Sequence, residues 1–125
     1  MKKRPWHALQ RKAKRGYRGH PLATIALYGP DDSLATKLVA AIVSHDGADP
    51  EPMRKWHALT DIRGEAAVLS ELREFLAEHG VVSLIIPERL LGCPHEEGID
   101  YPRGETCPRC PFWKNVDRWT GKRVH

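Results

Sequence analysis

The chain has 125 residues, of which 41% are hydrophobic and 29% charged, and its formal net charge is +4 at pH 7. This length allows one domain with a modest core, and the composition is typical of a globular protein rather than a disordered or fibrous one. No apolar run is long enough to cross a bilayer, and the basic N-terminus lacks the apolar stretch of a secretory signal. We therefore expect a cytoplasmic protein with no membrane partner.

The first 20 residues differ in charge from the remainder. They contain eight Lys or Arg and no acidic residue, whereas the other 105 residues contain twelve basic and sixteen acidic side chains. Clustered Lys and Arg favour polyanions, because they neutralise phosphates and release condensed counterions. We predict that this arm contacts RNA, DNA or the ribosome; the alternative is a solvated tail. The candidate contacts are Lys2, Lys3, Arg4, Arg11, Lys12, Lys14, Arg15 and Arg18.

The same segment shows no apolar period that could pack on a core, so we expect a disordered arm over residues 1–20 whose deletion leaves the melting temperature nearly unchanged. Trp6 and Tyr17 lie among its charges. Aromatic rings in such a setting can stack on unpaired bases.

Two strands are predicted after the arm. Residues 22–29 are apolar and β-branched and end in a Gly-Pro turn. The run at 35–44 fits either a helix or a strand, and its β-branched residues favour the strand. A polar loop follows, and residues 53–62 can hold one helical turn.

The clearest helix is predicted over residues 65–80. Its apolar residues share one face, and Gly80 stands where a left-handed C-cap belongs. Residues 81–86 form a continuous apolar run typical of a buried strand. The prediction is a small α+β fold, a two-layer β-β-α-β sandwich over residues 21–91, whose last strand runs parallel to the second. One helix covers only one face of this sheet. The other face must be covered by the cysteine segment, which begins at residue 92, by the C-terminal tail or by a partner.

Residues 92–125 contain all three cysteines, in the pattern C-x-H, eleven intervening residues, then C-x-x-C. Zinc favours four sulfur or nitrogen ligands in a tetrahedron, and three Cys with one His are a common set. We predict that Cys93, His95, Cys107 and Cys110 bind one Zn2+ per chain. A thiol redox pair in "CPRC" and an iron–sulfur cluster are the alternatives, and three cysteines argue against a disulfide framework.

A catalytic metal is a further alternative. The sequence His95-Glu96-Glu97 followed by C-x-x-C is similar to the signature of zinc deaminases, which implies zinc ligation by His95, Cys107 and Cys110 and proton transfer by Glu97. The spacing is shorter than in that family, and Thr106 stands where it has proline. Cys93 would also fill the coordination position that catalysis needs open. A closed structural site is the preferred interpretation.

The segment "GCPHEEGIDYPRGETCPRCPFW" (92–113), followed by "DRWTG" (117–121), resembles the C-terminal part of a family of small uncharacterised bacterial proteins. A sequence similar to "ATIALYGPDD" and "ATK" (23–37) precedes it in that family. The resemblance covers residues 20–121 and leaves out the basic arm. It supports treating the cysteine segment as one unit and implies no activity.

Residues 111–125 carry aromatic residues at near-helical spacing, and we expect them to pack on the bare sheet face and over the metal loop. The alternative is a platform on which bases stack, with Lys114, Arg118, Lys122 and Arg123 contacting phosphates. The preferred function is a small zinc-binding module that binds nucleic acid or a ribonucleoprotein. A zinc-dependent hydrolase or deaminase-like enzyme using Glu96 or Glu97 and a protein–protein adaptor are the alternatives.

Overall fold

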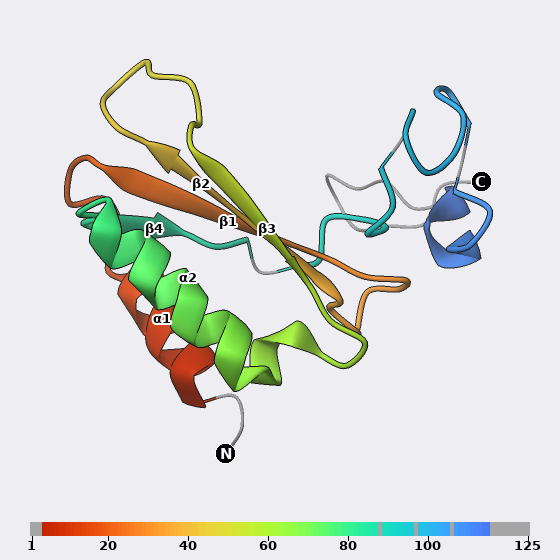
Figure 1. Cartoon of the computed structure of the whole chain (residues 1–125), viewed down its shortest axis with the longest axis horizontal. Helices are drawn as coiled ribbons and strands as arrows, with labels where there is room; N and C mark the ends of the chain where they lie inside the picture. The colour runs from red at the N-terminus through yellow and green to blue at the C-terminus, as the bar shows by residue number, and fades with distance from the viewer. Residues whose placement is uncertain (1–3, 88, 97, 106, 116–125) are drawn as a thin grey trace.

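The computed structural model describes residues 4–87, 89–96, 98–105 and 107–115. In chain order its elements are α1 (Arg4–Lys14), β1 (Leu22–Tyr28), β2 (Lys37–Val43), β3 (Met53–His57), the 3₁₀ helix η1 (Ile62–Gly64), α2 (Ala66–Glu78), β4 (Ser83–Ile85) and the 3₁₀ helix η2 (Pro111–Asn115). The strands form one sheet in the order β3-β2-β1-β4. Both α-helices lie on the same side of it (Figure 1). The α+β class predicted from the sequence is confirmed.

The hydrophobic core lies between the sheet and the two helices. Strands β1 and β2 form an antiparallel hairpin in which Ile25 is opposite Ala40 and Leu27 is opposite Leu38. All four side chains are buried, because alternate residues of a strand point to the same face. Helix α2 contributes the apolar stripe predicted from its periodicity, which consists of Leu69, Leu72, Phe75 and Leu76. Gly80 has φ of 62°, so the predicted left-handed C-cap is confirmed.

The structure corrects the prediction for residues 53–62. We expected a helical turn, but Met53–His57 form the edge strand β3, antiparallel to β2. Only Ile62–Gly64 are helical, as the 3₁₀ helix η1. Trp56 explains the strand: it points to the core, is 7% exposed, and meets the ring of Phe75 edge-on at 6.2 Å. Burial of one large aromatic side chain therefore outweighs the weak helical pattern of the segment.

The extra strand also changes the expected topology. Strand β4 pairs with β1, to which it is parallel, and not with β2. The reason is that β3 occupies the outer edge of β2, so that only the edge of β1 is free for the last strand. The chain passes through α2 between β3 and β4. These two strands are parallel to each other, because both run antiparallel to β2. Strand β3 pairs with β2 directly, and β4 is parallel to β1, which is itself antiparallel to β2.

The basic segment is the second correction, since most of it forms the helix α1 where we expected a disordered arm. Trp6 and Leu9 are 3% and 7% exposed, and Ala13 packs against the same core. Positions i, i+3 and i+7 share one helical face, so three apolar residues are enough to dock the helix beside α2. The helical spacing of these three apolar residues is present in the sequence, but it is weak because most of the residues around them are charged or polar.

Three basic residues of α1 lie at the end of the helix where positive charge is favourable. Arg11, Lys12 and Lys14 occupy its last turn, where cations interact favourably with the helix dipole. Within the described part of the chain, no helix combines the length and the apolar character needed to span a membrane.

Replacing Trp6 by Ala tests whether α1 is part of the folded unit. We expect the free energy of unfolding to fall by about 3–5 kcal/mol, because a buried aromatic side chain is lost and a cavity remains. Urea unfolding followed by circular dichroism measures the change. His7→Ala is the matched control, since His7 is exposed on the same helix and its loss should cost less than about 0.5 kcal/mol. Equal stability of the two variants would mean that α1 is not docked.

Candidate metal centre

The cysteine segment is attached to the sheet at the C-terminal end of β1. After β4 the chain continues beside β1: the Leu91 amide donates to the Leu27 carbonyl, and the Gly29 amide donates to the Gly92 carbonyl, each at 2.8 Å. Leu90 is buried in the core. These contacts place Cys93 just beyond the sheet, and the segment extends away from the helices (Figure 1).

Gly29 is the meeting point of both ends of this segment. Besides the bond to Gly92, its carbonyl accepts a hydrogen bond of 2.7 Å from Nε1 of Trp113. A Cβ atom at Gly29 would lie 1.7 Å from the Leu34 carbonyl oxygen, so any other residue would displace the backbone. The turn after β1 thus requires glycine because two backbone segments approach closely there.

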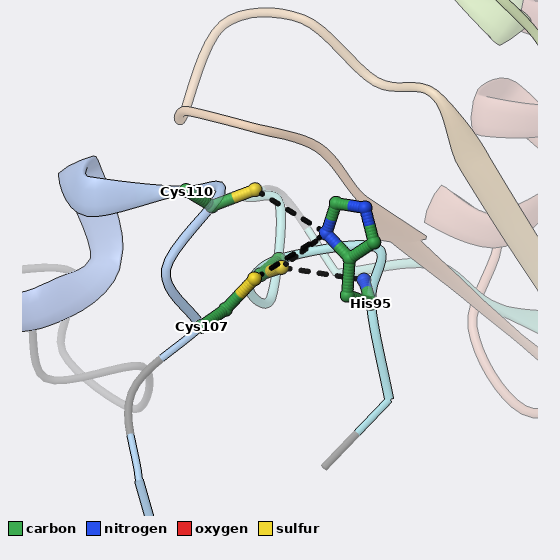
Figure 2. Close-up of side chains that lie close together, drawn as sticks. His95, Cys107 and Cys110 are labelled. Carbon is green, nitrogen blue, oxygen red and sulfur yellow. Dashed lines mark hydrogen bonds between the residues drawn. The ribbon is translucent and has the colours of Figure 1, made fainter. Parts of the chain in front are cut away.

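Four candidate ligand atoms converge within the segment. The thiol sulfurs of Cys93, Cys107 and Cys110 lie 3.1, 3.4 and 3.5 Å from Nδ1 of His95. All four ligand atoms lie within 4.8 Å of one another. Figure 2 shows Cys107 and Cys110 on one side of the imidazole, with their sulfurs directed at the same ring nitrogen. The four residues could therefore hold one metal ion.

The spacing suits a tetrahedral metal ion. With metal–sulfur bonds of about 2.3 Å and metal–nitrogen bonds of about 2.0 Å, tetrahedral geometry separates nitrogen from sulfur by about 3.5 Å. The observed Nδ1–sulfur distances of 3.1–3.5 Å are close to this value. A metal would bind to Nδ1 of His95, which leaves Nε2 directed away from the sulfurs (Figure 2).

Backbone amides are directed at two of the sulfurs. The His95 amide donates to Sγ of Cys93 at 3.2 Å. The amides of Arg109 and Cys110 form hydrogen bonds to the Cys107 thiol. Such donors stabilise negative charge on sulfur, so both ligand loops are shaped to hold thiolates.

The three thiols ionise unequally. Burial raises the pKa of the Cys93 thiol to about 12 and also raises the pKa of Cys110. Burial opposes ionisation of Cys107 as well, but the Arg109 amide and the neighbouring thiols outweigh it, so its pKa lies below the usual value. Three adjacent thiolates would repel one another in a partly buried site, and a bound cation would remove this cost.

Two lysines connect the ligand loop to the sheet. Lys37 of β2 is 5% exposed, and its Nζ donates to the Pro94 carbonyl at 3.2 Å and lies 3.4 Å from the Glu96 carboxylate. Lys55 of β3 donates to both oxygens of Glu96, at 3.0 and 3.2 Å. Hydrogen bonding to Lys55, together with the charge of Lys37, holds the pKa of Glu96 below its usual value. The loop between Cys93 and His95 is thus fixed to β2.

The same residues line a hollow of about 360 Å3 between the helix-free face of the sheet and the ligand loop. Its walls include Tyr28, Val39 and Met53 from the sheet and Tyr101 from the segment. The cysteine segment therefore covers one end of the sheet face that the helices leave bare.

The predicted site residues have different outcomes. Glu96 points at the two lysines, which accounts for its carboxylate without a role at the metal. Glu97 lies outside the described residues. Among the candidate phosphate contacts, Lys2 and Lys3 also lie outside them, and Arg4 begins α1. The exposed candidates are Arg11, Lys12, Lys14, Arg15 and Arg18.

Part of the predicted tail packing lies in the described chain. Trp113 is half-buried against the core, and its ring meets that of Phe112 edge-on at 5.0 Å. The predicted contacts of Arg118, Trp119, Lys122 and Arg123 fall outside the described residues and stay predictions, as does a phosphate contact by the Lys114 side chain.

Sequence reasoning missed Lys37 and Lys55. A lysine that begins an apolar run, as in "KLVAAIV", is an unusual candidate for burial, and this was the only available signal. Its partners Pro94 and Glu96 are nearly 60 positions away in the chain.

No protein-family model, no curated protein and no solved structure matches this chain. The resemblance to small bacterial proteins therefore stays a prediction.

Lys37→Met should weaken metal binding by about 10- to 100-fold, the usual effect of losing a residue that orients a ligand loop from behind. The reason is that Pro94 loses its donor and Glu96 loses one of two cations. Competition with a chromophoric chelator measures the affinity.

Lys55→Met is the matched control. It removes a cation from Glu96 but keeps the bond between Lys37 and Pro94, and we expect a smaller loss. An unchanged affinity in Lys37→Met would show that the loop keeps its shape without this contact.

Proposed function

We propose that this protein is a small nucleic-acid-binding module whose cysteine segment is held in shape by one structural zinc ion. The observation that supports the zinc most directly is the convergence of four protein ligand atoms within 4.8 Å. The support for nucleic-acid binding is the concentration of exposed cations on and after α1.

Zinc suits this ligand set best. It accepts three thiolates and one imidazole in a closed tetrahedron without redox chemistry. An iron–sulfur cluster would need its ligands distributed around several iron atoms, whereas these ligand atoms surround the volume of a single ion. All three cysteines are free thiols, and none is paired in a disulfide.

The proposed metal is structural because its shell is complete. A catalytic zinc keeps one position for water, but here Cys93 supplies a fourth protein ligand. The carboxylate of Glu96, one candidate base, is engaged by Lys37 and Lys55. No specific observation favours the deaminase-like alternative or the adaptor.

The nucleic-acid surface is proposed on the solvent side of α1 and the residues that follow it. Trp6 and Leu9 fix the helix to the core, and Arg11, Lys12 and Lys14, which follow them on the same helix, are exposed to solvent. In the described part of the chain, the side chains of Arg11, Lys12 and Arg15 form no ion pair. Unpaired cations on a rigid helix can contact phosphates without first breaking internal salt bridges.

Metal analysis tests the first half of the proposal. The purified full chain should contain about one zinc per molecule. Cys93→Ser should lose zinc as completely as Cys107→Ser, because both are ligands of a closed shell. Glu96→Gln is the control and should retain the metal. If Cys93→Ser keeps its zinc, the site has only three protein ligands and the structural assignment is wrong.

Charge removal on α1 tests the second half. Arg11→Gln combined with Arg15→Gln should weaken binding of a labelled single strand of about 15 nucleotides, and it should reduce the slope of log K against log salt by about 1.4. Gln keeps the helix propensity close to that of Arg. Fluorescence anisotropy at several salt concentrations measures both effects.

The matched control removes two exposed arginines of the cysteine segment, Arg103→Gln with Arg109→Gln. If this control reduces the salt slope as much as the α1 variant does, the binding surface is not on α1.

A further inference from the structure

A cleft of about 260 Å3 lies where the end of α1 meets the edge strand β4. One wall is the last turn of α1, with Gln10, Ala13 and Lys14, and the other is β4 and its continuation, with Ile85 and Ile86. Tyr17 stands at its rim, in the loop that joins α1 to β1. The cleft is separate from the metal centre, since none of its residues belongs to the cysteine segment.

Tyr17 is the aromatic residue of the basic segment that remains accessible. Its side chain is 68% exposed, whereas Trp6, the other aromatic residue there, is 3% exposed and belongs to the core. Of the two residues that could stack on a base, only Tyr17 presents its ring to solvent.

The exposed ring is nevertheless held in place. The Tyr17 hydroxyl and Nδ1 of His20 form a hydrogen bond of 2.8 Å, and the two rings meet edge-on at 5.4 Å. The loop itself is tied to β4, because the Arg18 amide donates to Oγ of Ser83 and that hydroxyl donates to the Gly19 carbonyl, each at 2.8 Å. A positioned ring loses little conformational entropy when it binds a ligand.

The surroundings of the cleft are cationic and apolar. Lys14, Arg15 and Arg18 flank Tyr17 and are exposed. No acidic side chain lines the cleft among the described residues, and Ile85 on its wall is 52% exposed. A ligand that fits must therefore combine negative charge with a flat apolar surface.

The outer edge of the cleft can also form hydrogen bonds. Strand β4 is an edge strand of the sheet, and its outer side has no strand partner in the described chain. Backbone amide and carbonyl groups along such an edge are available to the polar rim of a planar ligand. A nucleobase has such a rim, and its faces are apolar.

We propose that Tyr17 and the cleft beside it bind one unpaired base of a single-stranded nucleic acid, with Lys14, Arg15 and Arg18 contacting the adjacent phosphates. This inference rests on the proposed function of the α1 surface and specifies its substrate. The base stacks on the tyrosine ring, as aromatic side chains of single-strand-binding proteins do. A base inside a duplex is stacked and paired, so it cannot reach the ring without being flipped out.

The experiment compares Tyr17→Leu with the unaltered full chain, both zinc-loaded, using a labelled single-stranded DNA and the duplex of the same sequence. Tyr17→Leu should weaken single-strand binding by about tenfold or more, the usual effect of losing one stacking residue. Duplex affinity should be unchanged, because it depends on phosphate contacts alone. Tyr17→Phe is the matched control: it keeps the ring and loses the bond to His20, and most of the affinity should remain.

A second measurement locates the base. Light-induced cross-linking of a single strand containing 5-iodouracil, followed by mass spectrometry, should give a cross-linked peptide that contains Tyr17. Cross-links only at Trp113, or equal single-strand affinity of Tyr17→Leu and the unaltered protein, would overturn the base site.

The two proposals can fail separately. If Tyr17→Leu binds normally while Arg11→Gln with Arg15→Gln binds weakly, the base site is wrong and the α1 surface stands. If the unaltered protein binds neither the single strand nor the duplex, both proposals are wrong.

Discussion

The convergence of three sulfurs and one imidazole nitrogen is the constraint on which the described residues between 92 and 113 depend. Among the described residues of 92–113, the only helix or strand is part of the short 3₁₀ helix η2, and Cys107 and Cys110 are the only buried hydrophobic residues. In place of an apolar core, the segment has amides directed at sulfur and a glycine turn that anchors both its ends. A metal ion would supply the missing cohesion, because its binding free energy adds to that of folding.

The site is built into the sheet rather than appended to it. Gly29 donates a hydrogen bond to Gly92 and accepts one from Trp113. Lys37, on the central strand β2, donates a hydrogen bond to Pro94. Loss of the metal should therefore perturb the backbone at the ends of β1 and β2. The lysine also matters for charge. Three thiolates and a divalent cation carry one net negative charge, and a buried ammonium group nearby offsets it.

Docking of α1 changes what the basic segment can do. A disordered arm would lose conformational freedom on binding, whereas a helix fixed by Trp6 and Leu9 presents its cations in a set geometry. The loop that follows is fixed to β4 through Ser83, so the exposed ring of Tyr17 shares this rigidity. The helix surface and the metal centre lie at different parts of the sheet, so that one could be altered without the other.

Much of the fold followed from local pattern. The stripe of α2, the Gly80 cap and the existence of a strand after it were predictable because each depends on residues close in sequence, but that strand is a partly exposed edge strand and not the buried one expected. The convergence of Cys93, His95, Cys107 and Cys110 was predictable for a related reason, since C-x-H and C-x-x-C spacing brings candidate donors together within short loops. These are the parts of the structure in which short-range chemistry decides the outcome.

The failures share a different cause. Helix α1 depends on two buried residues in a 20-residue segment with eight cations, and strand β3 depends on the burial of Trp56 against a helix that follows it. In both segments a tertiary contact overrides the local pattern. The bond between Lys37 and Pro94 joins residues 57 positions apart, and no single sequence reveals such a pair.

X-ray absorption at the zinc K-edge of the full-length protein tests the central claim most directly. The closed centre predicts three sulfur ligands at about 2.3 Å and one nitrogen at about 2.0 Å, with no oxygen in the shell. Two sulfurs accompanied by a water oxygen would contradict it, since Cys93 would then be unbound and the metal open to chemistry.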